Sequence, residues 1–123
     1  MTVILSFLPP LFRMHSLQQL TFLHRYAQLG SDFSCAVYPT PLPAPYLISF
    51  NAAAARLLDL DSGAAQRPDF AEQFCGNRIP PAAQPLAMLY AGHQFGHFVS
   101  QLGDGRAILL GEVRNQVGEH WEV

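Results

Sequence analysis

The chain has 123 residues, of which 50% are hydrophobic and 13% charged, proportions that indicate one small globular domain. They exclude a disordered tail and a coiled coil. The formal net charge of -2, with every arginine isolated in the sequence, provides no basic stripe for a nucleic acid. So few charges also predict exposed apolar surface that faces another part of a larger fold.

The N-terminal segment, residues 1–13, is apolar but short, has no basic residues at its beginning, and contains Pro9 and Pro10. It therefore predicts neither a signal peptide nor a membrane span. One hypothesis is that translation starts at Met14 and that these residues are an upstream extension. The rest divides into a helical and Pro-rich segment, residues 14–89, and a strand-rich segment, residues 90–123.

Two cysteines, Cys35 and Cys75, lie far apart without the spacing of a metal site. This pattern favours buried or half-buried thiols in a reducing compartment, and we expect a cytoplasmic protein of bacterial type. A disulfide between the two cysteines remains an open alternative.

The first predicted element is a helix over residues 17–29. Ser16 and Gln19 form a capping-box pattern, leucines and aromatic residues supply an apolar face, and Gly30 is a suitable stop. Four alternating prolines then predict an extended connector over residues 38–45, in preference to a ligand for a proline-recognising partner.

The middle of the chain predicts a strand over residues 46–50, followed by a helix over residues 52–60 that Asn51 caps. A second helix is expected over residues 69–75. The apolar run at residues 86–91 follows a group of prolines and predicts a further short helix.

The last third of the chain predicts three antiparallel strands, over residues 98–102, 107–113 and 119–123, joined by turns at 103–106 and 115–118. The expected fold class is therefore α+β, with N-terminal helices and an extended Pro-rich segment that lead into an antiparallel sheet.

The first of these turns, Gly103-Asp104-Gly105-Arg106, is the candidate functional site. Glycines expose backbone N–H groups, and the arginine behind them suits an anion such as a phosphate. Taken alone, the pattern is more typical of a simple hairpin turn, in which the side chain of Asp104 forms a hydrogen bond with the backbone of the turn.

Other candidate residues favour structural roles. His93 and His97 have a spacing that suggests zinc on a helix, but the glycines beside them argue against a helix and a third ligand is missing. Glu112 and Glu119 are expected to be solvated or salt-bridged, and Trp121 is expected in the core.

Several irregular motifs resemble the opening part of the selenoprotein O family, also called the YdiU family. They are Tyr-Ala-Gly-His-Gln-Phe-Gly at 90–96, Gln-Leu-Gly-Asp-Gly-Arg-Ala at 101–107, Leu-Leu-Gly-Glu at 109–112, the Pro-rich segment at 41–51 and Cys-Gly-Asn at 75–77. The resemblance runs from about residue 20 to the end. Ser100 departs from it, because a proline commonly stands there in the family.

The resemblance implies a protein-kinase-like fold, of which this chain is the N-terminal part and supplies the first strands of the small lobe. It also implies a protein adenylyltransferase that uses ATP and Mg²⁺ or Mn²⁺ to attach AMP to hydroxyl groups of protein substrates. The nucleotide-contacting loop of the family falls on Gly103, Gly105 and Arg106. Neither a nucleic acid nor a membrane is an implied partner.

The family's phosphate-binding lysine, catalytic aspartate and metal-binding Asn and Asp residues have no counterpart in these 123 residues. We therefore expect the chain alone to be catalytically incomplete. The alternative is a non-enzymatic product, either a truncated remnant or a small nucleotide- or protein-binding domain.

Overall fold

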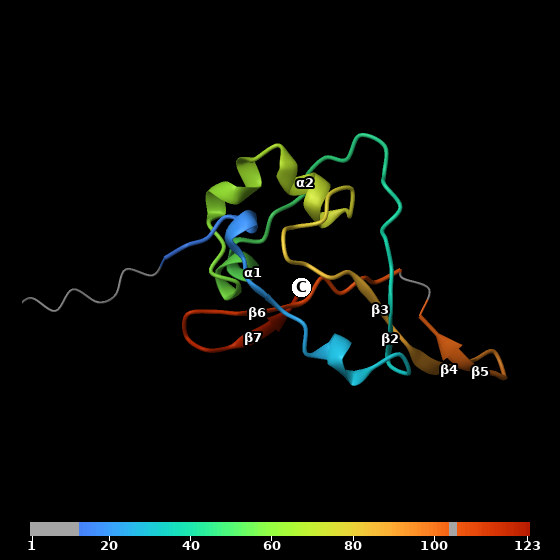
Figure 1. The fold of residues 1–123 in the computed structure, drawn as a ribbon. Helices are drawn as coiled ribbons and strands as arrows, with labels where there is room; N and C mark the ends of the chain where they lie inside the picture. The colour runs from blue at the N-terminus through green and yellow to red at the C-terminus, as the bar shows by residue number, and fades with distance from the viewer. Residues whose placement is uncertain (1–12, 104–105) are drawn as a thin grey trace, which may run out of the picture.

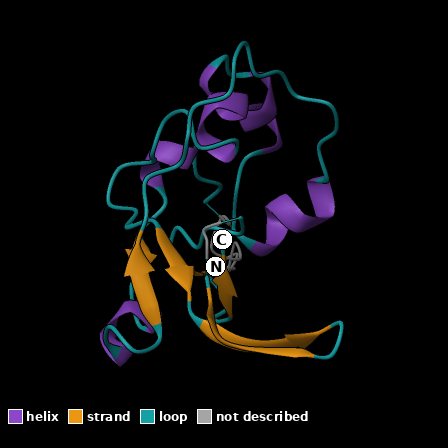
Figure 2. Ribbon diagram, turned by 90° about the vertical axis from the view of Figure 1, so that its right-hand side faces the viewer, coloured by secondary structure: helices purple, strands orange, loops and turns teal. Residues whose placement is uncertain are grey.

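The computed structural model describes residues 13–103 and 106–123. Most of the helical turns gather on one side of the molecule and the strands on the other, but the short helix at residues 26–29 lies beside the strands (Figures 1 and 2). The elements in chain order are η1 (Leu17–Gln19), β1 (Phe22–Leu23), η2 (Tyr26–Leu29), β2 (Ser34–Ala36), α1 (Ala52–Leu57), η3 (Ser62–Gln66), α2 (Asp69–Phe74), β3 (Leu86–Met88), β4 (Tyr90–Gln94), β5 (His97–Leu102), β6 (Glu112–Arg114) and β7 (His120–Glu122), where η marks a 3₁₀ helix. The mixed helices and antiparallel strands agree with the expected α+β class.

The hydrophobic core lies where the helical side meets β1 and β6. Its buried members are Leu17, Leu20, Phe22, Ala55, Leu60, Ala64, Phe70 and Val113. Phe70 of α2 also stacks edge-on against Phe50, with ring centroids 5.6 Å apart. Burial of each leucine, phenylalanine or valine of this cluster contributes roughly 2 kcal/mol to stability.

The predicted helix over residues 17–29 is wrong. The capping pattern is real, because the backbone N–H of Ser16 donates to Oε1 of Gln19 at 3.0 Å, but it opens only the short η1. Leu20 then becomes extended, and Phe22 pairs with Val113 across β1 and β6. This long-range pairing buries Phe22 and outweighs the helical periodicity of the segment.

The two central helices are confirmed. Oδ1 of Asn51 accepts hydrogen bonds from the N–H groups of Ala53 and Ala54 at 2.9 and 3.1 Å, as an N-cap should. α1 ends earlier than predicted, because Asp59 takes a left-handed conformation with φ of 53°. α2 ends before Cys75, close to the predicted boundary.

Two predicted elements of the middle segment are wrong. Residues 46–50 form no strand, since no neighbouring segment pairs with them, and Ile48 is 86% exposed. Residues 86–91 are not helical but supply β3 and the start of β4. Leu86 and Ala87 are both buried, and a strand covered on both faces has the same continuous apolar pattern as a short buried helix.

In the part of the chain that the structure describes, the strands form three small antiparallel sheets, β1-β6-β7, β2-β3 and β4-β5. The predicted single sheet is therefore wrong, because β5 pairs with β4 and not with the strand that follows it. The predicted strand at 107–113 is reduced to β6 and to an isolated bridge between Leu109 and Leu86. β7 and the turn before it agree with the prediction.

The Pro-rich connector is anchored to the end of α2. Asn77 exchanges two hydrogen bonds with Leu42, at 2.7 and 2.8 Å, and Pro39 packs closely over Gly76. No helix or strand interrupts residues 37–50, which agrees with the predicted connector, but the segment is not extended throughout, because it bends at residues 43 and 44, where Ala44 has a φ of 44°.

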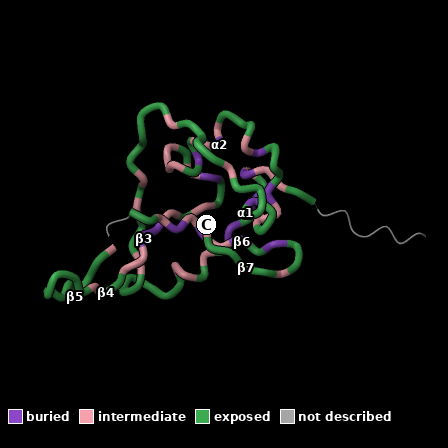
Figure 3. The backbone as a smooth tube through the Cα atoms, turned by 180° about the vertical axis from the view of Figure 1, so that it is seen from behind, coloured by how far each residue is buried: buried purple, intermediate pink, exposed green. Residues whose placement is uncertain are grey.

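Exposed apolar surface is extensive, as the low charge predicted. Figure 3 shows the β4–β5 hairpin as almost wholly exposed. Trp121 is 37% exposed, which contradicts its assignment to the core. Both cysteines are free thiols, and Cys35 is exposed where the sequence favoured a buried or half-buried position.

Candidate functional site

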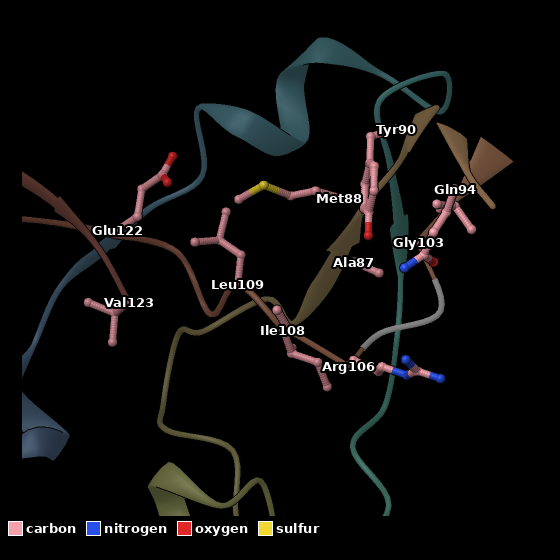
Figure 4. Close-up of a pocket in the computed structure, with 12 residues that line it drawn as sticks. Ala87, Met88, Tyr90, Gln94, Gly103, Arg106, Ile108, Leu109, Glu122 and Val123 are labelled. Atoms are coloured by element: carbon pink, nitrogen blue, oxygen red, sulfur yellow. The ribbon is translucent and has the colours of Figure 1, made fainter. Parts of the chain in front are cut away.

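A groove of about 650 Å³ lies beside the predicted phosphate loop. Strands β3, β4 and β5 form one wall, residues 106–109 form another, and the end of β7 closes one side (Figure 4). The residues that line it are Ala87, Met88, Tyr90, Gln94, Leu102, Gly103, Arg106, Ala107, Ile108, Leu109, Glu122 and Val123. Its volume lies within the range of small-molecule sites.

Gly103, one of the predicted site residues, lies on the wall of this groove with φ of +135°. A Cβ at this position would stand 2.7 Å from the backbone oxygen of Met88 and 2.6 Å from Cδ2 of Leu89. Only glycine fits both the conformation and the space. Glycine at residue 103 therefore allows the chain that leaves β5 to pass close to the junction of β3 and β4.

Arg106, the second predicted residue, also lines the groove. It begins the segment that runs to Leu109, whose backbone exchanges hydrogen bonds of 2.9 and 3.0 Å with Leu86. This pairing fixes the segment beside β3, so the structure brings Arg106 and Gly103 to one groove. Gly105, the third predicted residue, and Asp104 lie outside the described residues.

The groove combines an apolar lining with a few polar groups. Met88, Ile108 and Leu109 supply apolar surface, whereas Tyr90 and Gln94 bring neutral polar side chains. Figure 4 places Arg106 and Gln94 towards one end and Glu122 towards the other. Such a lining suits a ligand with a flat apolar part and an anionic part.

Sequence reasoning missed the wall that β3 and β4 supply. Tyr90 and Gln94 reach the groove because β4 folds back on β5, with Tyr90 opposite Leu102 and Gln94 opposite His97. The sequence signal available for this hairpin was the residue pair Phe95-Gly96, since glycine is common in tight turns. In the structure both residues have positive φ angles, as in a two-residue hairpin turn.

A cluster of three ionisable side chains, Arg25, Glu112 and His120, holds β7 in place. The end of β7 closes one side of the groove. The guanidinium of Arg25 contacts Oε2 of Glu112 at 2.6 and 3.0 Å, and Nδ1 of His120 lies 2.6 Å from Oε1 of the same carboxylate. The hydrogen bond from Arg25, followed by that from His120, lowers the pKa of Glu112 below its ordinary value. Glu112 is thus salt-bridged, as expected, and it ties β6 to β7.

The histidines of the hairpin lie on different faces of it. His93 is opposite Phe98 and His97 is opposite Gln94, and successive positions of a strand alternate between the two faces. The two imidazoles therefore point to opposite sides and do not form a common metal site. Over residues 13–103 and 106–123, no three His, Cys, Asp or Glu side chains gather in a group suited to a metal ion.

In the part of the chain that the structure describes, no helix has both the length and the apolar character needed to cross a membrane.

Comparison with known proteins provides a further finding. Residues 16–123 match the family model described as protein adenylyltransferase SelO. A protein nucleotidyltransferase YdiU of Thiobacillus denitrificans is 53% identical over 110 residues, which cover 89% of this chain and 22% of that relative. The YdiU protein of Pseudomonas fluorescens strain SBW25 is also 53% identical over 110 residues, and that of Ectopseudomonas mendocina is 51% identical. The chain thus spans less than a quarter of the length of these relatives.

Proposed function

Because the chain belongs to the SelO family of protein adenylyltransferases, we propose that it forms part of the ATP site of such an enzyme. In this role the groove beside Gly103 and Arg106 receives the nucleotide. The complete protein transfers AMP from ATP to hydroxyl groups of protein substrates.

The observation that supports this proposal best is the position of the two predicted phosphate contacts. Gly103 and Arg106, which belong to one contiguous motif, both line the groove, and the groove continues into apolar surface at Met88, Ile108 and Leu109. A guanidinium forms paired hydrogen bonds with phosphate oxygens, and apolar side chains cover the faces of a base. One groove thus offers partners for both ends of a nucleotide.

The strands around the groove correspond in this proposal to the first strands of a kinase-like small lobe. In such a lobe a glycine-rich turn covers the phosphates and a sheet supports the base. β4, β5 and the close turn at Gly103 provide comparable parts here.

The divalent metal that accompanies ATP, Mg²⁺ or Mn²⁺, finds no fitting donor set among the described residues. Among the described residues, Glu122 is the single acidic side chain that lines the groove, and a lone carboxylate does not make a metal site. We therefore assign no metal ligand to residues 13–103 and 106–123. For these residues the proposal covers binding and orientation of the nucleotide only.

The test is calorimetric titration of the chain with ATP and Mg²⁺. Arg106→Ala should weaken ATP binding by about tenfold or more, because a charge-assisted contact to phosphate contributes about 1.5–3 kcal/mol. Arg114→Ala is the matched control, since Arg114 is exposed on β6 and does not line the groove. Equal ATP affinity of the Arg106→Ala variant and the unsubstituted chain would refute the proposed site.

Transfer of AMP is tested separately, on a polypeptide of the family's full length. Labelled ATP, Mn²⁺ or Mg²⁺ and a protein substrate should yield labelled protein, and Arg106→Ala should reduce the yield. ATP binding without any transfer by the full-length polypeptide would favour a non-enzymatic, nucleotide-binding role.

A further inference from the structure

Glu122 lies at the end of the groove away from the proposed phosphate contacts. It is exposed and lines the groove, and Figure 4 shows it at the opposite end from Arg106. In that view the apolar side chains of Met88 and Leu109 lie between the two. Among the described residues the carboxylate of Glu122 has no hydrogen-bond or ion-pair partner. It is therefore available to a ligand in the groove.

The basic side chains that hold β7 contact a different carboxylate. Glu112 lies opposite Glu122 in the pairing of β6 with β7, and opposite residues of an antiparallel pair share one face of the sheet. Arg25 and His120 both contact Glu112, each at 2.6 Å. The ion pairs of this cluster thus leave the negative charge of Glu122 uncompensated.

The two ends of the groove therefore differ in charge, with a guanidinium at Arg106 and a carboxylate at Glu122. A triphosphate is attracted to the first and repelled by the second. Because the sugar lies next to the phosphates in a nucleotide, the base is the part that reaches Glu122, past Met88 and Leu109. An ionised carboxylate only accepts hydrogen bonds, so its partner on the base must be an N–H donor.

We propose that Glu122 recognises the base of the nucleotide, and that its carboxylate accepts a hydrogen bond from the 6-amino group of adenine. This inference rests on the proposed function, because it requires ATP in the groove with its phosphates at Arg106. The apolar side chains cover the faces of the ring, and Glu122 contacts its edge. Glu122 is thus a specificity-determining residue and takes no part in the transfer of AMP.

Calorimetric titration of the chain with ATP and with the triphosphate of purine riboside, both with Mg²⁺, tests this contact. The analogue differs from ATP only by a hydrogen in place of the 6-amino group. The unsubstituted chain should bind ATP about fivefold more tightly than the analogue, the typical effect of one hydrogen bond. Glu122→Ala should bind the two equally. Comparison of two triphosphates cancels the general effect of removing a negative charge, which acts on both.

Glu72→Ala is the matched control, since Glu72 is exposed on α2 and does not line the groove. It removes the same charge and should keep the preference for ATP. Circular dichroism must show that Glu122→Ala keeps the secondary structure of the unsubstituted chain. If it does not, Glu122→Val, with a side chain that suits a strand, takes its place.

An unchanged preference for ATP in the Glu122 variant would overturn the inference. If Arg106→Ala nevertheless weakens ATP binding, the groove holds the nucleotide and only the base contact is wrong. If the chain binds no ATP, or if Arg106→Ala leaves binding unchanged, the proposed function fails and the inference fails with it. Should the Glu122 variant instead lose a preference for ATP over 2′-deoxy-ATP, the carboxylate contacts the ribose, which also overturns the assignment to the base.

Discussion

Gly103 lies directly against the main chain of Met88: a Cβ at residue 103 would stand 2.7 Å from the backbone oxygen of Met88. This close approach joins the start of the proposed phosphate loop to the end of β3. The shape of the groove therefore depends on glycine at this position, quite apart from any contact that Gly103 makes with a ligand.

Gly103→Ala should destabilise the chain more than Gly96→Ala. Both glycines have a positive φ, so either substitution strains the backbone by about 1 kcal/mol. Nothing lies within 4 Å of a Cβ at Gly96, whereas at Gly103 a methyl group meets the backbone of β3. Urea denaturation measures both free energies of unfolding, and equal losses would contradict the close packing at Gly103.

Glu112→Gln should reduce the loss of stability in acid. The folded pKa of Glu112 lies below its ordinary value because of Arg25 and His120, so the ionised carboxylate stabilises the folded state. That contribution is complete above the ordinary pKa of 4.5 and is lost as the pH falls through the lowered folded value. The variant lacks it and should show a flatter stability profile below about pH 5.

The matched control is Glu72→Gln, at an exposed residue of α2 for which the described residues provide no ion pair. Thermal unfolding followed across the acid range compares the three proteins. The explanation is wrong if the profile of Glu112→Gln has the same slope as that of the unsubstituted chain.

Asn115→Ala should cost about 1–3 kcal/mol of stability, because it leaves buried polar groups without their partner. Asn115 is 7% exposed, its Nδ2 donates to the oxygen of Leu57 at 3.1 Å, and its Oδ1 accepts from the N–H of Glu119 at 2.8 Å. Gln116→Ala, at an exposed neighbour, should cost less than about 1 kcal/mol. Chemical denaturation provides both values, and the reverse order would refute the assigned role of Asn115.

Local signals predicted local structure well. Asn51 caps α1 as the sequence indicates, and the turn before β7 lies where its glycine suggests. Segments whose partners are distant in sequence were predicted less well. Phe22 leaves the predicted helix because Val113 pairs with it, and neither residue carries a local sign of that pairing.

The candidate site was predictable only in part, again because local motifs can be recognised in the sequence and pairings between distant segments cannot. Gly103 and Arg106 come from a motif that is contiguous in sequence, and both line the groove. The opposite wall depends on β3, which pairs with β2 and bridges Leu109. The apolar run that contains Met88 reads equally as helix or strand, so its place in the wall could not be derived from the sequence.

The most direct test of the account is an amide NMR titration of the isotopically labelled chain with ATP and Mg²⁺. We predict that the largest shifts fall on Gly103, Arg106 and Ile108 and on the residues of β3 and β4 that face them. The amides of residues 46–50, which lie outside this groove, should remain unchanged. Shifts confined to other surfaces, or no shifts at all, would contradict the assignment of the nucleotide site to this groove.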